Sequence, residues 1–367
     1  MSLRVKHLNA DSSFLLIFSP PCALHNPQGT FPGSFTIILD PWLSGPSTVW
    51  NSKFALTTHV IDSCVETLAE LPDPDLVIIS QDKPDHCHQE TLIQLPVDTA
   101  ATILGTPGAA KKIRGWKHFD PLHVQALRRY DERQEDTIHR IPIPAYSPAG
   151  SAGEVTVTLM VSKRDLTGLH NAIGITYRPP SSVLSANTSS YINLPLTPPT
   201  TPPSGQRPTT PIYESRIAYG SPLTNKEKTV SVIYCPHGVN YNLVKPWASS
   251  HLLAETALPL TALLHSFDRL SNPWYLGGNV MAGSPGGLEI ARNLFAKAWI
   301  SAHDEDKINT GLAVMNLKTV KFKRDEIRGM LQSSGRDSVG SNNSSKARNH
   351  TALVELEAGE EYFTGVR

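Results

Sequence analysis

The residues best suited to chemistry lie in one short stretch, 75–92, with the sequence DLVIISQDKPDHCHQETL. Its apolar start predicts a buried strand that ends near Ser80, after which a polar loop presents Asp85, His86 and His88 before a helix. Side chains that follow a strand in this way are well placed to converge on a cleft. Imidazole and carboxylate groups together suit a borderline metal such as zinc or ferrous iron. The stretch therefore predicts a metal site, although such a cluster alone is more often solvated or capping.

Composition and charge argue against several other functions. Lys plus Arg and Asp plus Glu both number 33, so the formal net charge is zero and nucleic acid is not an expected partner. A small-molecule substrate is expected instead, and no G-x-S-x-G sequence indicates a serine hydrolase. No segment approaches the roughly 18 apolar residues of a membrane span, and no export signal is recognisable. Four scattered cysteines predict free thiols and a cytoplasmic location.

The elements that must position the loop alternate between strands and helices. Short apolar or alternating runs predict strands at 14–18, 35–39, 76–79, 155–161, 172–177 and 230–234. Apolar spacing and capping residues predict helices at 64–71, 106–113 and 287–299. Such alternation favours an α/β fold in which helices cover sheets.

Two segments have compositions typical of disordered inserts. Residues 179–211 are rich in Pro and Thr, and residues 333–349 are rich in Ser and Asn. The apolar residues at 352–356 and Tyr362 predict that the chain then returns to the body as a terminal strand. Because there is no internal repeat, we expect a single domain, 1–367, with both inserts on its surface. The sequence does not indicate an oligomeric state.

The order of five motifs resembles that of the metallo-β-lactamase-fold hydrolases. The motifs are FTIILDPWLSG, DLVIISQDKPDH, ILGTPGAAKKI, VIYCPHG and AKAWISAHDED, and the resemblance covers the chain from Leu3 to about His303. The lactonase-like branch is most similar, especially a plant, cyanobacterial and fungal subgroup with a glutamine in the first position of the family's metal motif and a later Pro-His-Gly. The resemblance implies a four-layer αββα sandwich with the site along one edge, between the two sheets.

The resemblance also implies a set of site residues. The family's first metal motif, His-x-His-x-Asp-His, reads Gln81, Lys83, Asp85 and His86 here, so the two histidines for a first metal are absent. The family's bridging aspartate matches His237, and its final histidine matches His303, in a segment (299–303) that the resemblance places at the end of a strand. One ion, zinc or else iron or manganese, is therefore implied, with the ligands Asp85, His86, His237 and His303.

Further residues carry additional or alternative roles. Lys83 is predicted to place fixed positive charge where the first metal would lie, and Asp85 either ligates the metal or serves as general base. Asp85 could instead cap the following helix, and His237 and His303 could be ordinary turn or strand-end residues. The remaining candidates for the site are Gln81, His88, His170 and Asp40. His170 is the nearest match to a missing family histidine. Asp40 resembles an acid that supports the site without binding metal, and its alternative role is to start a turn.

Two functions from different classes follow from this pattern. The first is a metal-dependent hydrolase acting on an ester, lactone or phosphoester-like bond. The alternative is a metal-free, catalytically silent binding or scaffold protein that keeps the fold. A nuclease is disfavoured by the zero net charge and by the missing histidines.

Overall fold

The computed structural model describes most of the chain. The described residues are 1–21, 32–146, 148, 150–162, 165, 167–180, 229–333 and 351–365. The inserts predicted at 179–211 and 333–349 lie outside them, apart from Pro179, Pro180 and Ser333. Cys22 also lies outside, while the other three cysteines are free thiols, as predicted.

The first large sheet has seven strands in the order β20-β1-β2-β3-β6-β7-β8. Strands β20, β1, β2 and β3 pair antiparallel, and β3, β6, β7 and β8 pair parallel. The strands are β1 (Ser2–His7), β2 (Phe14–Ser19), β3 (Phe35–Leu39), β6 (Leu76–Ile79), β7 (Thr102–Gly105), β8 (Val124–Ala126) and β20 (Glu361–Gly365).

The second large sheet repeats this plan in the order β19-β16-β13-β12-β11-β10-β9. Strands β9 to β12 pair antiparallel, and β12, β13, β16 and β19 pair parallel. The strands are β9 (Ile138–Ile143), β10 (Gly153–Val161), β11 (Asn171–Arg178), β12 (Val230–Cys235), β13 (Ala262–His265), β16 (Ala298–Ile300) and β19 (Ala352–Val354). The last stretch of chain therefore adds an edge strand to each sheet, β19 to the second and β20 to the first.

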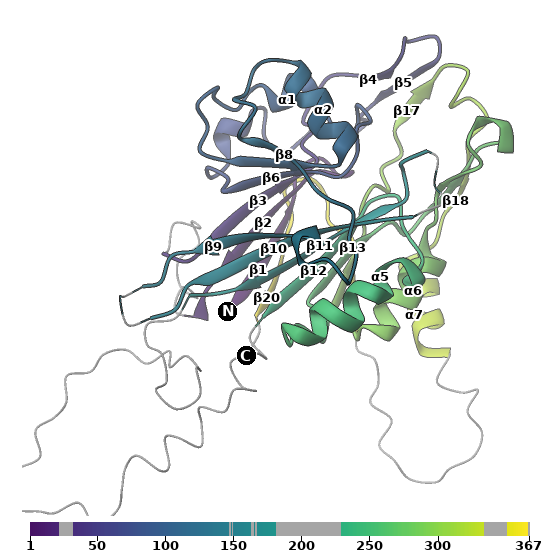
Figure 1. The fold of residues 1–367 in the computed structure, drawn as a ribbon. Helices are drawn as coiled ribbons and strands as arrows, with labels where there is room; N and C mark the ends of the chain where they lie inside the picture. The colour runs from purple at the N-terminus through teal and green to yellow at the C-terminus, as the bar shows by residue number, and fades with distance from the viewer. Residues whose placement is uncertain are drawn as a thin grey trace, which may run out of the picture.

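Helices cover the outer face of each sheet (Figure 1). Helices α1 (Gln89–Leu92) and α2 (Pro107–Gly115) lie with the first sheet. Helices α5 (Tyr241–Trp247), α6 (Ser284–Asn293) and α7 (Arg324–Ser333) lie with the second, and a π-helical turn (Ala248–Leu252) continues α5. Short 3-10 turns lie at Leu68–Glu70, Glu135–Thr137 and Trp274–Leu276. No helix among the described residues is long and apolar enough to cross a bilayer.

The core has three apolar layers because successive strand residues face opposite sides of a sheet. In β6, Leu76 and Ile78 join the layer between the sheets, whereas Val77 and Ile79 face α1 and α2. In β12, Val232 joins the central layer, whereas Ile233 faces the helices that cover its own sheet, α5, α6 and α7. The resulting order of helix, sheet, sheet and helix is the αββα sandwich that the sequence predicted.

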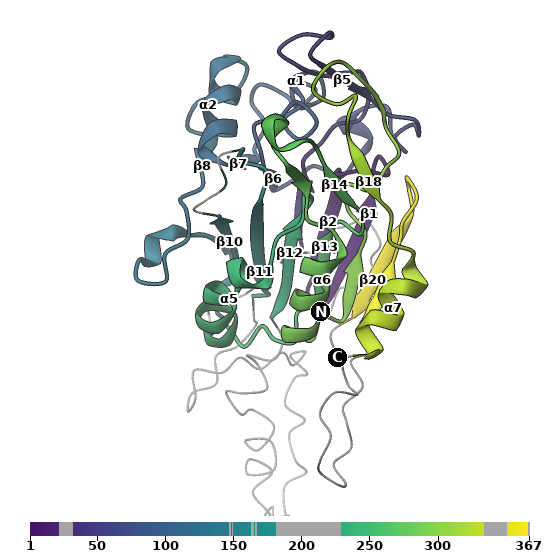
Figure 2. The same ribbon diagram turned by 90° about the vertical axis from the view of Figure 1, so that its right-hand side faces the viewer.

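Two small three-stranded sheets accompany the sandwich. One contains β4 (Ser47–Val49), β5 (Ala55–Thr58) and β17 (Ile308–Thr310), in the order β17-β5-β4. The other contains β14 (Arg269–Ser271), β15 (Asn279–Met281) and β18 (Lys318–Val320), in the order β15-β14-β18. Figure 1 shows the first of them, with β4, β5 and β17, at the end away from the termini; β14 and β18 of the other lie lower in Figure 2.

All six predicted strands are present, but two predicted helices are wrong in extent. Over 64–71 only the turn Leu68–Glu70 forms, because the Cys64 amide donates to Leu8 O at 2.8 Å and Thr67 is extended. The helix predicted at 287–299 begins at Ser284 and ends at Asn293. Phe295 then takes a left-handed φ of 50°, which a helix cannot accommodate, and Ala298–Ile300 forms β16.

Candidate metal centre

Four potential metal ligands meet where strands of both sheets end. Asp85 and His86 follow β6, His237 follows β12, and His303 follows β16. One ligand atom from each residue lies within 4.8 Å of the ligand atoms of the other three. The three histidines are buried, and the Asp85 side chain keeps 21% exposure. The structure therefore brings together the four residues that the sequence proposed as ligands.

The Nδ1 atom of each of the three imidazoles lies at hydrogen-bond distance from an acceptor oxygen. A carboxylate or a carbonyl oxygen can only accept, so each Nδ1 must carry the hydrogen and each Nε2 is left with its lone pair. Metal-ligating histidines are commonly oriented in this way. The three bonds are His86 to Asp40 Oδ2 at 2.8 Å, His237 to Val280 O at 2.9 Å and His303 to Asp11 Oδ2 at 2.9 Å.

Asp40 is fixed in place by several donors. It is fully buried at the end of β3, where its Oδ1 accepts from the Ser80 amide at 2.7 Å. Its Oδ2 accepts from the hydroxyls of Ser80 and Tyr234, at 2.5 and 2.7 Å, as well as from His86. Asp40 thus contacts the candidate ligand His86 directly, in the supporting position that the family resemblance implied. Its φ of 40° is a strained backbone conformation of the kind that gathers at functional sites.

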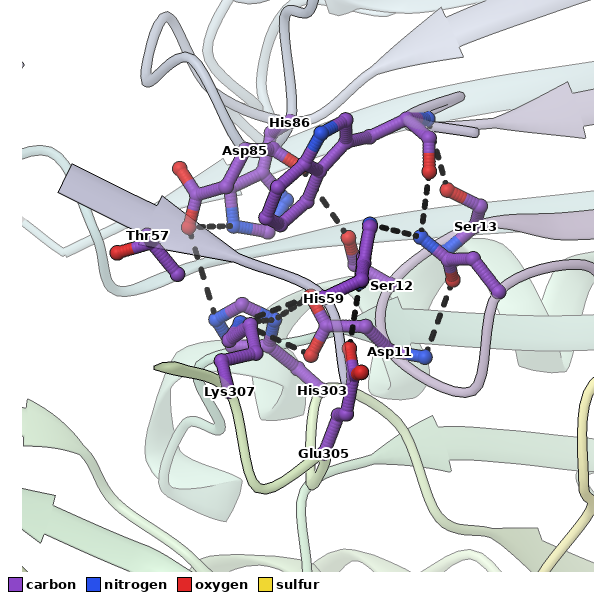
Figure 3. A network of polar contacts seen from close by, with 12 residues as sticks. Asp11, Ser12, Ser13, Thr57, His59, Asp85, His86, His303, Glu305 and Lys307 are labelled. Atoms are coloured by element: carbon purple, nitrogen blue, oxygen red, sulfur yellow. Dashed lines mark hydrogen bonds and ion pairs between the residues drawn. The ribbon is translucent and has the colours of Figure 1, made fainter. Parts of the chain in front are cut away.

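Asp11 and Lys307 support His303, and the sequence analysis singled out neither (Figure 3). The Lys307 ammonium lies 2.9 and 2.8 Å from the two carboxylate oxygens of Asp11. The backbone of His303 also donates to Asp11 O at 2.7 Å, and His303 has a left-handed φ of 67°. No local motif marks Asp11, which follows β1; only the fold brings it to His303.

Burial and charge shift the pKa values of these groups in opposite directions. Burial alone would lower the pKa of His86, but the carboxylates of Asp85 and Asp40 outweigh it and raise that pKa. Burial, together with the neighbouring His303 and His86, holds the pKa of His237 well below its usual range. Burial would raise the pKa of Asp11, but His303 and Lys307 hold it well below the usual range. Asp11 is therefore ionised beside His303 at neutral pH.

The donor set fits one divalent ion. The Nε2 atoms of His86 and His237 face one another at 3.0 Å, and the Asp85 Oδ2 atom lies 3.8 Å from the first and 3.9 Å from His303 Nε2. Two imidazole lone pairs at that separation require a proton or a cation between them. Three nitrogens and one carboxylate oxygen are a donor set that zinc or ferrous iron accepts.

The other predicted site residues lie around this cluster. Gln81 donates from Nε2 to Leu169 O at 3.0 Å, while its buried Oε1 has no hydrogen-bond partner among the described residues. The Lys83 ammonium contacts Asp82 at 2.9 Å, and its side chain is 34% exposed. Neither residue contributes a donor to the cluster of four.

The two remaining histidines are held by local contacts. His88, rather than Asp85, is the N-cap of α1, and its Nδ1 accepts from the Thr91 amide at 3.3 Å. His170 lies with Nδ1 at 3.2 Å from Gly238 O and Nε2 at 3.1 Å from Asn279 O. Neither belongs to the group of four donors.

An open groove of about 1590 Å³ runs beside the centre. The four clustered donors do not line it, but Gly238 and Asn279 do, and these residues neighbour His237 and Val280. Residues 126–134 also line it, among them Arg129 and Arg133. Both arginine side chains lack a carboxylate partner among the described residues. The groove offers room for a substrate next to the candidate metal ligands.

Comparisons with known proteins agree with this fold. No family model and no curated protein matches the chain. A possible metal-dependent hydrolase from Veillonella parvula DSM 2008 shares 13% identity over 99% of both chains, with a TM-score of 0.50. The isothiocyanate hydrolase from Delia radicum gut bacteria shares 12% over 98% of both, with a TM-score of 0.49. The metallo-β-lactamase fold protein YhfI from Bacillus subtilis shares 11% over 99% of both, with a TM-score of 0.44.

At such identities the likeness concerns the fold alone. Two mixed sheets face one another, helices cover both outer faces, and the candidate ligands follow strands of both sheets at one edge. The chain has the metallo-β-lactamase fold.

Proposed function

We propose that the chain is a metal-dependent hydrolase with one divalent ion held by Asp85, His86, His237 and His303. The observation that carries this proposal is the orientation of the three imidazoles. Each donates Nδ1–H to a fixed acceptor, so that the three Nε2 atoms converge beside a carboxylate. The name of the Veillonella parvula protein, a possible metal-dependent hydrolase, agrees with it.

The chain's own residues would divide the work of hydrolysis. A bound divalent ion supplies a Lewis acid and lowers the pKa of a water to about 7. Asp40, Val280 and Asp11 keep the three imidazoles in one tautomer and one orientation. Asp85 is the most exposed of the four donors, and its second oxygen points away from His86 and His303 (Figure 3). That oxygen is available to accept a proton from an attacking water.

We propose an ester, lactone or phosphoester-like bond as the target. The groove beside Gly238 would hold the rest of the substrate, with Arg129 and Arg133 among the residues that line it. Whether Lys83 adds positive charge stays a prediction, because its ammonium contacts Asp82.

A second candidate function is a metal-free binding protein, and one contact favours it. His86 and His237 can share a single proton across their 3.0 Å separation, with the proton held mainly by His86, whose pKa is raised. The cluster would then be satisfied without an ion, and Lys307 would balance Asp11.

Elemental analysis of the purified protein separates the two functions. We expect about one zinc, iron or manganese ion per chain, the stoichiometry of a single four-donor site. His86→Ala and His303→Ala should both lose the ion, while His170→Ala, the matched control, should retain it.

Absence of metal, even after reconstitution with each of the three ions, would rule out the hydrolase and favour the binding protein. Two ions per chain would show that ligands outside the cluster of four exist. Loss of the ion in His170→Ala would assign that histidine to the site.

A further inference from the structure

The large apolar side chains that are exposed gather in three segments. Of the fifteen such side chains among the described residues, nine lie within 47–61, 269–283 and 307–323. Trp50 and Trp274 are the most exposed, at 85% and 87%. The other seven are Val60, Ile61, Tyr275, Ile308, Leu312, Met315 and Val320. Exposed apolar surface of this extent on a folded protein commonly marks an interaction site.

Backbone contacts join the three segments into one surface, which we call the docking rim. Strand β17 pairs with β5, and the Leu312 amide donates to Lys53 O at 3.1 Å. Strand β14 pairs with β18, and the Asn272 side chain donates to Ala313 O at 3.0 Å. Figure 1 shows β5 and β17 at the end of the molecule away from the termini, and Figure 2 shows β14 and β18 side by side below β5.

The docking rim is basic although the whole chain is neutral. Its three segments contain six Lys or Arg residues and no Asp or Glu, and the six are Lys53, Arg269, Lys307, Lys318, Lys321 and Lys323. Lys307 pairs with Asp11, and Lys321 pairs with Asp268 and Asp306. The other four have no carboxylate partner among the described residues. Asp62, Asp268 and Asp306 border the three segments, so the rim combines exposed apolar side chains with a net excess of basic ones, four of which form no ion pair among the described residues.

We propose that the docking rim binds the surface of an anionic lipid membrane. Tryptophan and tyrosine favour the boundary between water and lipid, and basic side chains are attracted by anionic headgroups. Six of the nine exposed side chains are aliphatic or methionine, which insert among lipids but cannot stack on nucleic-acid bases. An interface between two copies of the chain would be depleted of unpaired lysines at its centre. Lipid is therefore the occupant that fits both the apolar and the charged side chains.

The docking rim also forms part of the wall of the metal centre. Val280, whose carbonyl accepts from His237, lies in the second segment, and Lys307 begins the third. A membrane held by the rim would thus lie beside the mouth of the centre. The binding itself does not depend on the proposed hydrolase, because the rim residues are not metal ligands.

Vesicle flotation with the full chain tests the proposal. The probes are vesicles of phosphatidylcholine alone and of phosphatidylcholine with phosphatidylserine, in the presence of a chelator so that metal content plays no part. We expect binding to the anionic vesicles that weakens as salt is added. Lys53→Gln with Lys318→Gln should weaken it about 25-fold, since each basic residue near the surface contributes about fivefold. Trp50→Ser with Trp274→Ser should weaken it at least tenfold.

Matched controls change the same residue types outside the docking rim. Leu122 and Phe295 are exposed apolar residues, and Lys111 and Lys245 are exposed lysines. Leu122→Ser with Phe295→Ser, and Lys111→Gln with Lys245→Gln, should bind like the unmodified chain. Circular dichroism would verify that each variant is folded.

Three results would overturn the proposal. The first is no binding to either vesicle by the folded, unmodified chain. The second is equal loss in the rim variants and the controls. The third is evidence that the rim binds another partner. In that case the Trp50→Ser, Trp274→Ser variant would lose oligonucleotide binding or self-association, while its binding to vesicles would be unchanged.

Discussion

His303 is held by residues that lie far from it in the sequence. Its Nδ1 atom donates to Asp11, 292 positions earlier, and Asp11 in turn accepts from Lys307. The ammonium keeps the carboxylate ionised in a buried place, where the charge would otherwise be costly. Asp11 and Lys307 are therefore positioning residues that act through the ring of His303.

Replacing Lys307 should weaken metal binding without removing a ligand. In Lys307→Met the Asp11 carboxylate loses its cation and holds the His303 ring less firmly. We expect a metal dissociation constant roughly tenfold higher, at the low end of the effect of outer-shell partners. Lys307→Arg, which keeps the charge, should restore much of the affinity. Competition with a chromophoric chelator measures the constant directly.

Lys83→Ala serves as the comparison for Lys307→Met. Because the Lys83 ammonium contacts Asp82, we expect unchanged metal affinity in this variant. An effect of Lys83→Ala equal to that of Lys307→Met would assign positive charge at the centre to Lys83, as the sequence analysis predicted. No effect in either variant would remove Lys307 from the supporting set.

The sequence could predict the four clustered donors and the supporting Asp40, but not the residues that orient His303. Asp85, His86 and His237 follow strands that their own apolar runs predict. His303 follows β16, whose first residues were predicted as helix, so only the order of the family's motifs located it. Asp11 and Lys307 follow no recognisable motif, and their roles depend on a contact across the whole chain. His88 shows the opposite case, since a histidine within the motif caps a helix.

At the scale of elements, helix α5 and its π-helical continuation pack against the outer face of the second sheet. His251 in this continuation is buried, and its Nε2 lies 2.9 Å from the hydroxyl of Thr156 in β10. Burial, aided by Arg140, lowers the pKa of His251 from 6.5 to about 4. Protonation of His251 is thus unfavourable in this packing.

The fold should lose stability as the pH falls from 6.5 towards 4, in part through His251. The unfolded chain binds a proton at His251 below pH 6.5, whereas the folded chain does so only below about pH 4. Stability from this group is therefore complete above 6.5 and is lost on acidification, by at most about 3 kcal/mol.

Urea unfolding of His251→Gln and of the unmodified chain, at about pH 7 and about pH 4.5, gives the free energy of unfolding at each pH. The contribution of His251 is the difference between the two proteins in how much of this free energy is lost. The variant should show the smaller loss between the two pH values. Parallel losses would mean that His251 does not titrate in this window.

The lengths of elements were harder to predict than their existence. Strand β3 and strand β6 were predicted to the residue, because their apolar runs are bounded by polar residues. The helix at 284–293 was predicted too far towards its C-terminal end, since the apolar residues after it belong to β16. A buried strand and the apolar face of a helix look alike in a short window, and only pairing with β13 and β19 separates them.

At the scale of the whole molecule, the candidate metal centre connects the two sheets. Asp85 and His86 follow a strand of the first sheet, whereas His237 and His303 follow strands of the second. An ion bound by all four would hold the two halves of the sandwich together at one edge. Removal of the metal should therefore destabilise the fold and also abolish the proposed hydrolysis.

We expect the free energy of unfolding to rise by about 2.7 kcal/mol when the free ion is present at 100 times its dissociation constant. Denaturant titrations with excess zinc and with excess chelator measure this difference. In His303→Ala the two titrations should coincide. A metal-dependent gain that persists in this variant would place the stabilising ion elsewhere.

The pairing of β20 with β1 has a consequence for the order in which the protein is made. Ser2 lies opposite Gly365, so the outer edge of β1 stays unpaired until the ribosome has released residue 365. The second sheet likewise waits for β19, which pairs with β16. During synthesis both sheets expose open edges of the kind that pair with other chains. The nascent chain should therefore depend on chaperones until both edge strands have left the ribosome.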